Sequence, residues 1–219
     1  TVKSSKLGIP AIGGKDSMSG TFEDLTVPPT LTAFAVNIAD ARWILSPEFK
    51  SNDSQVVLIK LERDQDDLPH FDQLDRSYTR IWRLAQEGKI RAAHSVRRGG
   101  IAEAVSKMCF GNRIGFVFEP IQEDDLFQPL YGSMILEISK EERLSKIFDG
   151  ISYTRLGTTQ EKESIFLHDE EITLEAVYQA WDEPLESVFP SRVDESSSTP
   201  DSFHCFSQGI DSCLSGNQL

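Results

Sequence analysis

Between residues 55 and 181 the spacing of apolar positions switches repeatedly between strand-like and helix-like. Residues 55–61 (QVVLIKL) form a continuous apolar run typical of a buried strand. Residues 72–87 place Leu74, Tyr78 and Ile81 on one face of a helix that stops at Gly88. Further strands are predicted at 91–96, 113–118, 133–138, 152–156 and 164–167, and further helices at 101–110, 139–149 and 172–181. This mixture predicts an α/β (α+β) domain in which helices cover a sheet.

The N-terminal segment has a different pattern. Residues 10–14 are short and apolar and end in two glycines, so we expect a buried strand that closes in a tight turn. Residues 15–20 then form a loop, and residues 30–38 (TLTAFAVNI) form a second strand after Pro28 and Pro29. Residues 1–42 are thus a strand-loop-strand unit without a core of its own, and residues 43–190 form the domain. Because residue 1 is Thr, we expect a piece of a longer polypeptide.

The composition changes after residue 190. Residues 191–219 contain eight serines and no aliphatic period, which is typical of a linker or tail. Two of the three cysteines, Cys205 and Cys213, lie there, and their spacing with Cys109 fits neither a disulfide framework nor a C-x-x-C metal site. We expect three reduced thiols.

Charge narrows the range of partners. The chain has 22 Lys and Arg against 35 Asp and Glu, a formal net charge of −13, which repels nucleic acid and anionic membranes. The sequence shows neither a membrane span nor a signal peptide, so we expect a cytoplasmic protein. A nucleotide remains possible because a metal ion or a few N–H groups can neutralise its phosphates locally.

The densest chemical signal is the run Gly13-Gly-Lys-Asp-Ser-Met-Ser-Gly20. Glycines allow a close approach to phosphate, Lys15 supplies a positive charge, and Asp16 is a hard oxygen ligand suited to Mg²⁺. The run lacks the spacing of a Walker A loop. A solvated turn of the same composition is the alternative.

Other candidates carry weaker signals. The turn His94-Ser-Val-Arg-Arg-Gly-Gly100 leads into a helix whose N-terminus could accept an anion, or it is an exposed basic turn with a structural His94. Four carboxylates in residues 119–125 could suggest a metal cluster, but no histidine stands at ligand spacing, which favours a solvated loop. The order of residues does not assemble a Ser-His-Asp or Cys-His arrangement.

The run from Ile9 to Leu31, with GKDSMS followed by PPTL, closely resembles phosphoribosylformylglycinamidine synthase (formylglycinamide ribonucleotide amidotransferase), specifically the second synthetase half of its large single-chain form. The resemblance covers residues 1–190. It implies the C-terminal domain of the aminoimidazole ribonucleotide synthetase superfamily, a mixed sheet covered by helices, preceded by a strand-loop-strand from the N-terminal lobe.

The resemblance also implies a function. The family consumes ATP and glutamine in de novo purine synthesis; ATP activates the formyl amide oxygen of formylglycinamide ribonucleotide, and ammonia from a glutaminase domain displaces the phosphate. The second half holds an auxiliary ATP or ADP with Mg²⁺. By this match Asp16 is a magnesium ligand, and the residues lining the nucleotide phosphates are Gly14, Lys15, Ser17, Met18 and Ser19. No residue of this chain is assigned a catalytic role.

One departure from the family pattern affects the turn at residues 94–100. The family shows His-Asp-x-Ser-Asp-Gly-Gly, whereas Ser95 and Arg98 replace both acidic residues here. This favours a structural half that is inactive alone and depends on the remaining synthetase and glutaminase domains as partners, with a dimer of the isolated piece as a possibility. The alternatives are another ATP-using enzyme of the superfamily, of the selenophosphate synthetase or thiamine monophosphate kinase type, and a non-enzymatic acidic interaction module.

Overall fold

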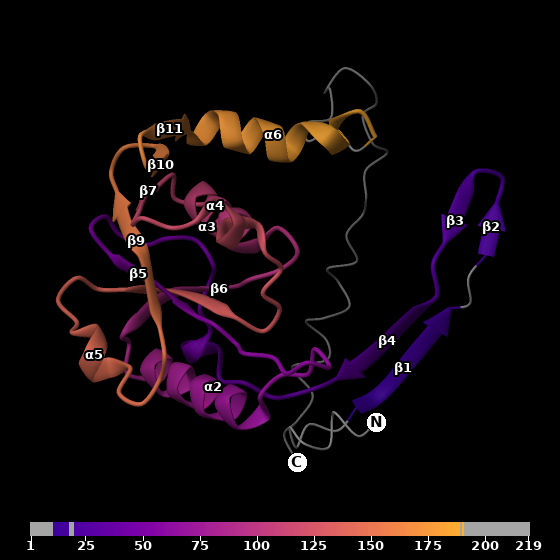
Figure 1. Cartoon of the computed structure of the whole chain (residues 1–219), viewed down its shortest axis with the longest axis horizontal. Helices are drawn as coiled ribbons and strands as arrows, with labels where there is room; N and C mark the ends of the chain where they lie inside the picture. The colour runs from indigo at the N-terminus through magenta and orange to yellow at the C-terminus, as the bar shows by residue number, and fades with distance from the viewer. Residues whose placement is uncertain (1–10, 18–19, 189, 191–219) are drawn as a thin grey trace, which may run out of the picture. The chain divides into compact units, whose positions relative to one another are not determined.

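The structure is a computed structural model that describes residues 11–17, 20–188 and 190 (Figure 1). The chain separates into two compact units, residues 1–178 and 179–219. No helix in the described part of the chain combines the length and apolarity needed to cross a bilayer.

A seven-stranded sheet organises the first unit. Its strands run in the order β11-β10-β7-β9-β5-β8-β6. The β10–β7 pair is parallel and the other neighbours are antiparallel, so the sheet is mixed, as the sequence predicts. The strands are β5 (Gln55–Ile59), β6 (Ile90–Ser95), β7 (Gly115–Phe118), β8 (Met134–Ile138), β9 (Thr154–Gln160), β10 (Ser164–Leu167) and β11 (Glu170–Thr173).

Helices cover both faces of this sheet (Figure 1). Val56 and Leu58 of the central strand β5 pack on one face with α3 and α4, whereas Val57 and Ile59 pack on the other with α2 and α5. Alternation along one strand therefore supplies two cores. The helices are a 3-10 turn η1 (Ala41–Trp43), α2 (Phe71–Gln86), α3 (Gly100–Phe110), α4 (Glu123–Phe127), α5 (Leu144–Ile147) and α6 (Leu174–Glu186).

The predicted helix boundaries are wrong in three places. The helix expected from residue 139 begins only at Leu144, because Ser139 turns back to contact Glu141. The acidic stretch expected to be irregular contains α4. The helix expected from residue 172 begins only at Leu174, because Glu170–Thr173 forms β11 beside β10.

The N-terminal segment forms strand pairs of its own. β1 (Ala11–Ser17) pairs antiparallel with β4 (Thr30–Ala35), and β2 (Gly20–Phe22) pairs with β3 (Leu25–Val27). The expected loop over residues 15–20 is therefore shorter than predicted, because β1 continues to Ser17. Apolar side chains lie open here, with Leu31 86% and Ile38 94% exposed.

A buried carboxylate fixes the entry to the central strand. Glu137 of β8 is 0% exposed and shares its sheet face with Ile135. Its Oε2 accepts a hydrogen bond from the Lys50 N–H (2.8 Å), and its Oε1 accepts from the Ser51 N–H (3.1 Å) and the Ser54 hydroxyl (2.7 Å).

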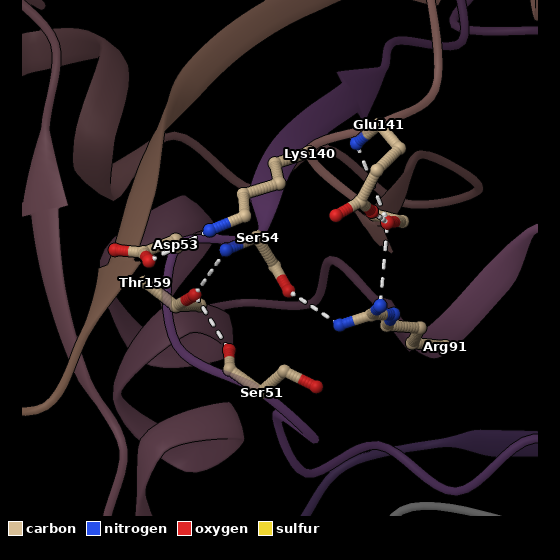
Figure 2. Close-up of polar contacts among 8 residues, drawn as sticks. Ser51, Asp53, Ser54, Arg91, Lys140, Glu141 and Thr159 are labelled. Atoms are coloured by element: carbon tan, nitrogen blue, oxygen red, sulfur yellow. Dashed lines mark hydrogen bonds and ion pairs between the residues drawn. The ribbon is translucent and has the colours of Figure 1, made fainter.

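Two residues of this segment, Ser51 and Ser54, also contact side chains of β9 and β6 (Figure 2). The Ser54 N–H donates to the Thr159 hydroxyl (2.8 Å), which itself donates to the Ser51 carbonyl (2.7 Å). Arg91 donates to the Ser54 hydroxyl at 3.4 Å and to the Ser139 hydroxyl at 3.2 Å. The segment leading into β5 is thus held by side chains of its two neighbours, β8 and β9, and of β6 beyond β8.

Replacing Glu137 tests this arrangement. Glu137→Ala leaves one buried and two part-buried donors without an acceptor and opens a cavity, so the free energy of unfolding should fall by about 3–5 kcal/mol. Glu137→Gln keeps the volume but turns one acceptor into a donor, and should cost about 1–3 kcal/mol. Urea denaturation measures both against Glu161→Ala, a control at an exposed carboxylate. A loss below about 1 kcal/mol for Glu137→Ala would contradict this role.

Candidate functional site

The phosphate-loop candidate lies mostly on strand β1. Gly14, Lys15, Asp16 and Ser17 pair in register with Ala33, Thr32, Leu31 and Thr30 of β4, and residues 14–16 are exposed. Met18 and Ser19 lie outside the described residues. The structure thus places four of the six predicted site residues in a paired strand rather than in a loop.

Strand geometry separates the two charged groups. Neighbouring residues of a strand point to opposite faces, so Lys15 and Asp16 do not share a face of the β1–β4 pair. A Cβ on Gly14 would lie 2.8 Å from the Thr32 carbonyl oxygen, so glycine serves the strand pairing at this position. In the described residues no hydrogen bond or ion pair holds either charged side chain.

The side chains of Lys15 and Asp16 meet only some of the requirements of a site for a nucleotide with magnesium. An exposed carboxylate is a proper Mg²⁺ ligand and an ammonium a proper phosphate partner. Within the described ranges, however, no group of three or more His, Cys, Asp or Glu side chains could hold a metal ion. Asp16 can therefore offer a single carboxylate ligand.

The second candidate is the turn between β6 and α3. Gly100 has φ +71°, and a Cβ there would lie 2.3 Å from the Leu126 carbonyl oxygen. The turn is therefore tightly packed beneath α4. Arg97 and Arg98 at this turn are exposed, and the described residues offer neither a carboxylate partner.

The N-terminus of α3 already has an anionic cap. The Gly99 N–H donates to a Glu103 carboxylate oxygen at 2.9 Å, and Lys107 contacts the same carboxylate at 2.5 Å. The Lys107 ammonium, together with the Gly99 bond and against some desolvation, lowers the pKa of Glu103. A bound phosphate would have to displace this carboxylate, so the structure favours the structural interpretation of the turn.

His94 also fits a structural role. Its Nδ1 lies 2.8 Å from the Ser95 carbonyl oxygen. Burial lowers the pKa of His94, with smaller contributions in the same direction from Lys107 and Arg97, while the Ser95 bond and Glu103 oppose the shift. The imidazole is therefore mainly neutral at pH 7 and adds no charge to the turn.

The remaining candidates form no reactive centre in the described residues. Glu119 forms an ion pair with Arg155 at 3.0 Å, and Glu123, Asp124 and Asp125 lie in the first turn of α4, where the helix dipole favours negative charge. Cys109 is a buried free thiol whose pKa burial raises, so it is a poor nucleophile. Cys205 and Cys213 lie outside the described residues.

The sequence analysis did not predict the roles of two carboxylates, Glu103 at the β6–α3 turn and Glu137 in β8. Glu103 is an acidic residue in the first turn of a helix, which is a recognisable cap signal. Glu137 sits at an inward position of an otherwise apolar strand, and such a charge requires buried partners.

This sheet with helices on both faces is the aminoimidazole ribonucleotide synthetase-like fold. The fold of this chain matches that of PurL structures from Thermotoga maritima. One, complexed with AMPPCP, aligns with a TM-score of 0.55 at 14% identity and covers 67% of this chain and 29% of that chain. Another, described as phosphoribosylformylglycinamidine synthase II, aligns with a TM-score of 0.57 at 14% identity and covers 80% and 32%.

In sequence the chain is similar to the PurL subunit of phosphoribosylformylglycinamidine synthase. It is 27% identical to the Thermoplasma acidophilum subunit over 179 residues, covering 70% of this chain and 23% of the relative. It is 26% identical to the Thermus thermophilus subunit over 213 residues, covering 84% and 29%. The chain therefore spans less than a third of these relatives. No family model matches it.

Two glycines with nearly the same backbone angle test the packing of the β6–α3 turn. Gly150 has φ +73° but, unlike Gly100, has open space where a methyl group would stand. Gly150→Ala should therefore lower the free energy of unfolding only by the cost of a left-handed backbone conformation, about 1–2 kcal/mol. Gly100→Ala should cost at least about 2 kcal/mol more, because α4 must shift. Equal losses in urea denaturation would show that the turn is loosely packed.

Proposed function

We propose that this chain is part of a cytoplasmic ATP-using ligase of purine biosynthesis, which converts formylglycinamide ribonucleotide to its amidine with nitrogen from glutamine. The similarity to PurL over 84% of the chain carries the proposal. The T. maritima PurL structures complexed with ATP and with ADP add that proteins of this fold bind nucleotides.

The proposed organisation follows the sequence. Residues 1–42 complete a synthetase-like N-terminal lobe, residues 43–190 are the synthetase-like C-terminal domain of the second half, and residues 191–219 lead towards a glutaminase domain. The exposure of Leu31 and Ile38 supports this division, because an isolated strand pair is only marginally stable in water. The rest of the lobe would cover these side chains.

The proposed role of the GKDSMS run is auxiliary nucleotide binding. Mg²⁺, when bound, offsets the charge of the phosphates. Asp16 would supply one carboxylate ligand, while Gly14, Lys15, Ser17, Met18 and Ser19 would line the phosphates. Since Lys15 and Asp16 lie on opposite strand faces, only one of them can reach a given phosphate directly unless β1 changes conformation.

An activity assay separates this proposal from its alternatives. The 219-residue chain supplied with formylglycinamide ribonucleotide, ATP, Mg²⁺ and glutamine or ammonia should form no amidine, whereas the complete synthetase that contains it should form the product. Amidine formation by the chain alone would contradict the proposed division of labour. Turnover of selenide or thiamine monophosphate by the complete protein, in place of the ribonucleotide, would overturn the proposed substrate.

The nucleotide role is tested at Asp16 in the complete synthetase. Asp16→Asn removes the anionic ligand and should weaken retention of ADP at least about tenfold, measured as nucleotide released from the purified protein on denaturation. Asp24→Asn is the matched control, because Asp24 is an exposed carboxylate of the same N-terminal segment. Equal retention in both variants would show that Asp16 lies in a solvated strand.

A further inference from the structure

A basic hollow of about 590 Å³ lies between α2 and the end of α5. Three arginines of α2, Arg76, Arg80 and Arg83, line one side, and Lys146 of α5 lies across from them. The spacing i, i+4, i+7 places the arginines on one face of the helix. Four cations thus gather around one concave surface of a chain whose net charge is −13.

These cations have no anionic partner in the described part of the chain. None of its ten ion pairs includes any of the four. Like charges three and four residues apart on a helix repel each other. Three like charges on one face of α2, none of them in an ion pair within the described residues, are what an external anion would compensate.

Backbone contacts orient two of the guanidinium groups. The Arg80 Nε donates to the Ile147 carbonyl oxygen at 2.6 Å, and the Arg76 Nε donates to the Asp72 carbonyl oxygen at 3.1 Å. Each bond uses only the Nε–H of its guanidinium. Within the described residues, the Nη groups of Arg76 and Arg80 form no hydrogen bond. A planar fork held by one edge is well suited to bind phosphate oxygens with the others.

The rest of the lining favours a small ligand with polar groups. Asp75 and Asp149 reduce the formal charge of the hollow to about +2 and can accept hydrogen bonds from ligand hydroxyls, and Thr79 adds a hydroxyl. Gly150 leaves open space where a side chain would stand. The volume is within the range of small-molecule sites, while the global negative charge disfavours a nucleic acid polymer.

We infer that the hollow formed by Arg76, Arg80, Arg83 and Lys146 binds a phosphate-bearing small molecule. This site is separate from the GKDSMS run and does not depend on the proposed function. It also differs from the β6–α3 turn, where Glu103 already occupies the helix N-terminus.

Calorimetric titration of the 219-residue chain at low salt tests the inference. Inorganic pyrophosphate, ribose 5-phosphate and ADP are the probes, which distinguish a polyphosphate from a sugar phosphomonoester. Arg80→Gln and Arg83→Gln should each weaken binding about threefold to tenfold, and the double variant about thirtyfold. Raising the salt concentration should weaken binding further.

Arg98→Gln is the matched control, because it removes the same charge at an exposed position outside the hollow. An equal loss of binding in Arg98→Gln would overturn the assignment and move the anion to the β6–α3 turn. Tighter binding of a short single-stranded oligonucleotide, with the same dependence on Arg83, would overturn the small-molecule class.

A second measurement covers the case in which a variant fails to fold. Backbone amide chemical shifts of the unmodified chain are followed during pyrophosphate titration. Saturable shifts concentrated at α2 and residues 146–151 support the inference. Shifts elsewhere, or none at millimolar probe, refute it.

Discussion

The Glu137 carboxylate is the polar constraint on which the domain depends. A buried carboxyl group is costly unless its oxygens are satisfied, and here two oxygens accept three hydrogen bonds from the segment that enters β5. β5 pairs with β8 on one side and β9 on the other, and its side chains supply both cores. One carboxylate of β8 therefore ties down the segment that enters the central strand.

Phe49 holds the other end of the segment that enters β5, through apolar packing. It is fully buried, stacks on Phe116 with ring centroids 5.7 Å apart, and its N–H donates to the Met108 carbonyl of α3. The segment between Phe49 and Ser54 is thus held at one end by packing and at the other by hydrogen bonds. Because the two anchors use different chemistry, neither alone defines the path of the chain.

The sequence predicts those elements whose apolar pattern matches their burial, on one face of a helix or on both faces of a central strand. The helix expected at residues 72–87 appears as α2, and the strand expected at 55–61 appears as β5. The prediction fails where a tertiary contact overrides local pattern. Glu170 and Glu171 suit a helix entry, yet the exposed edge of β10 recruits them into β11. Asp16 and Lys15 look like a loop, yet pairing with β4 extends the strand through them. In each case the residue types are compatible with a loop or a helix start. The strand that forms there depends on pairing with a segment elsewhere in the chain, which the local sequence does not show.

The two edges of the sheet end in different ways, and this limits how the domain can aggregate. At β6 the register shifts between Ile90 and Ala92, and the Ala93 N–H donates to the Ser46 carbonyl oxygen, so the outer hydrogen-bonding row is irregular and partly used. At the opposite edge β11 has only four residues, of which two are carboxylates. A second sheet that approached either edge would meet a bulge, or a short strand whose Glu171 is ion-paired with Lys162, instead of a long regular row of free amides. The sheet is therefore protected against open-ended strand addition without the need for a covering helix at its margins.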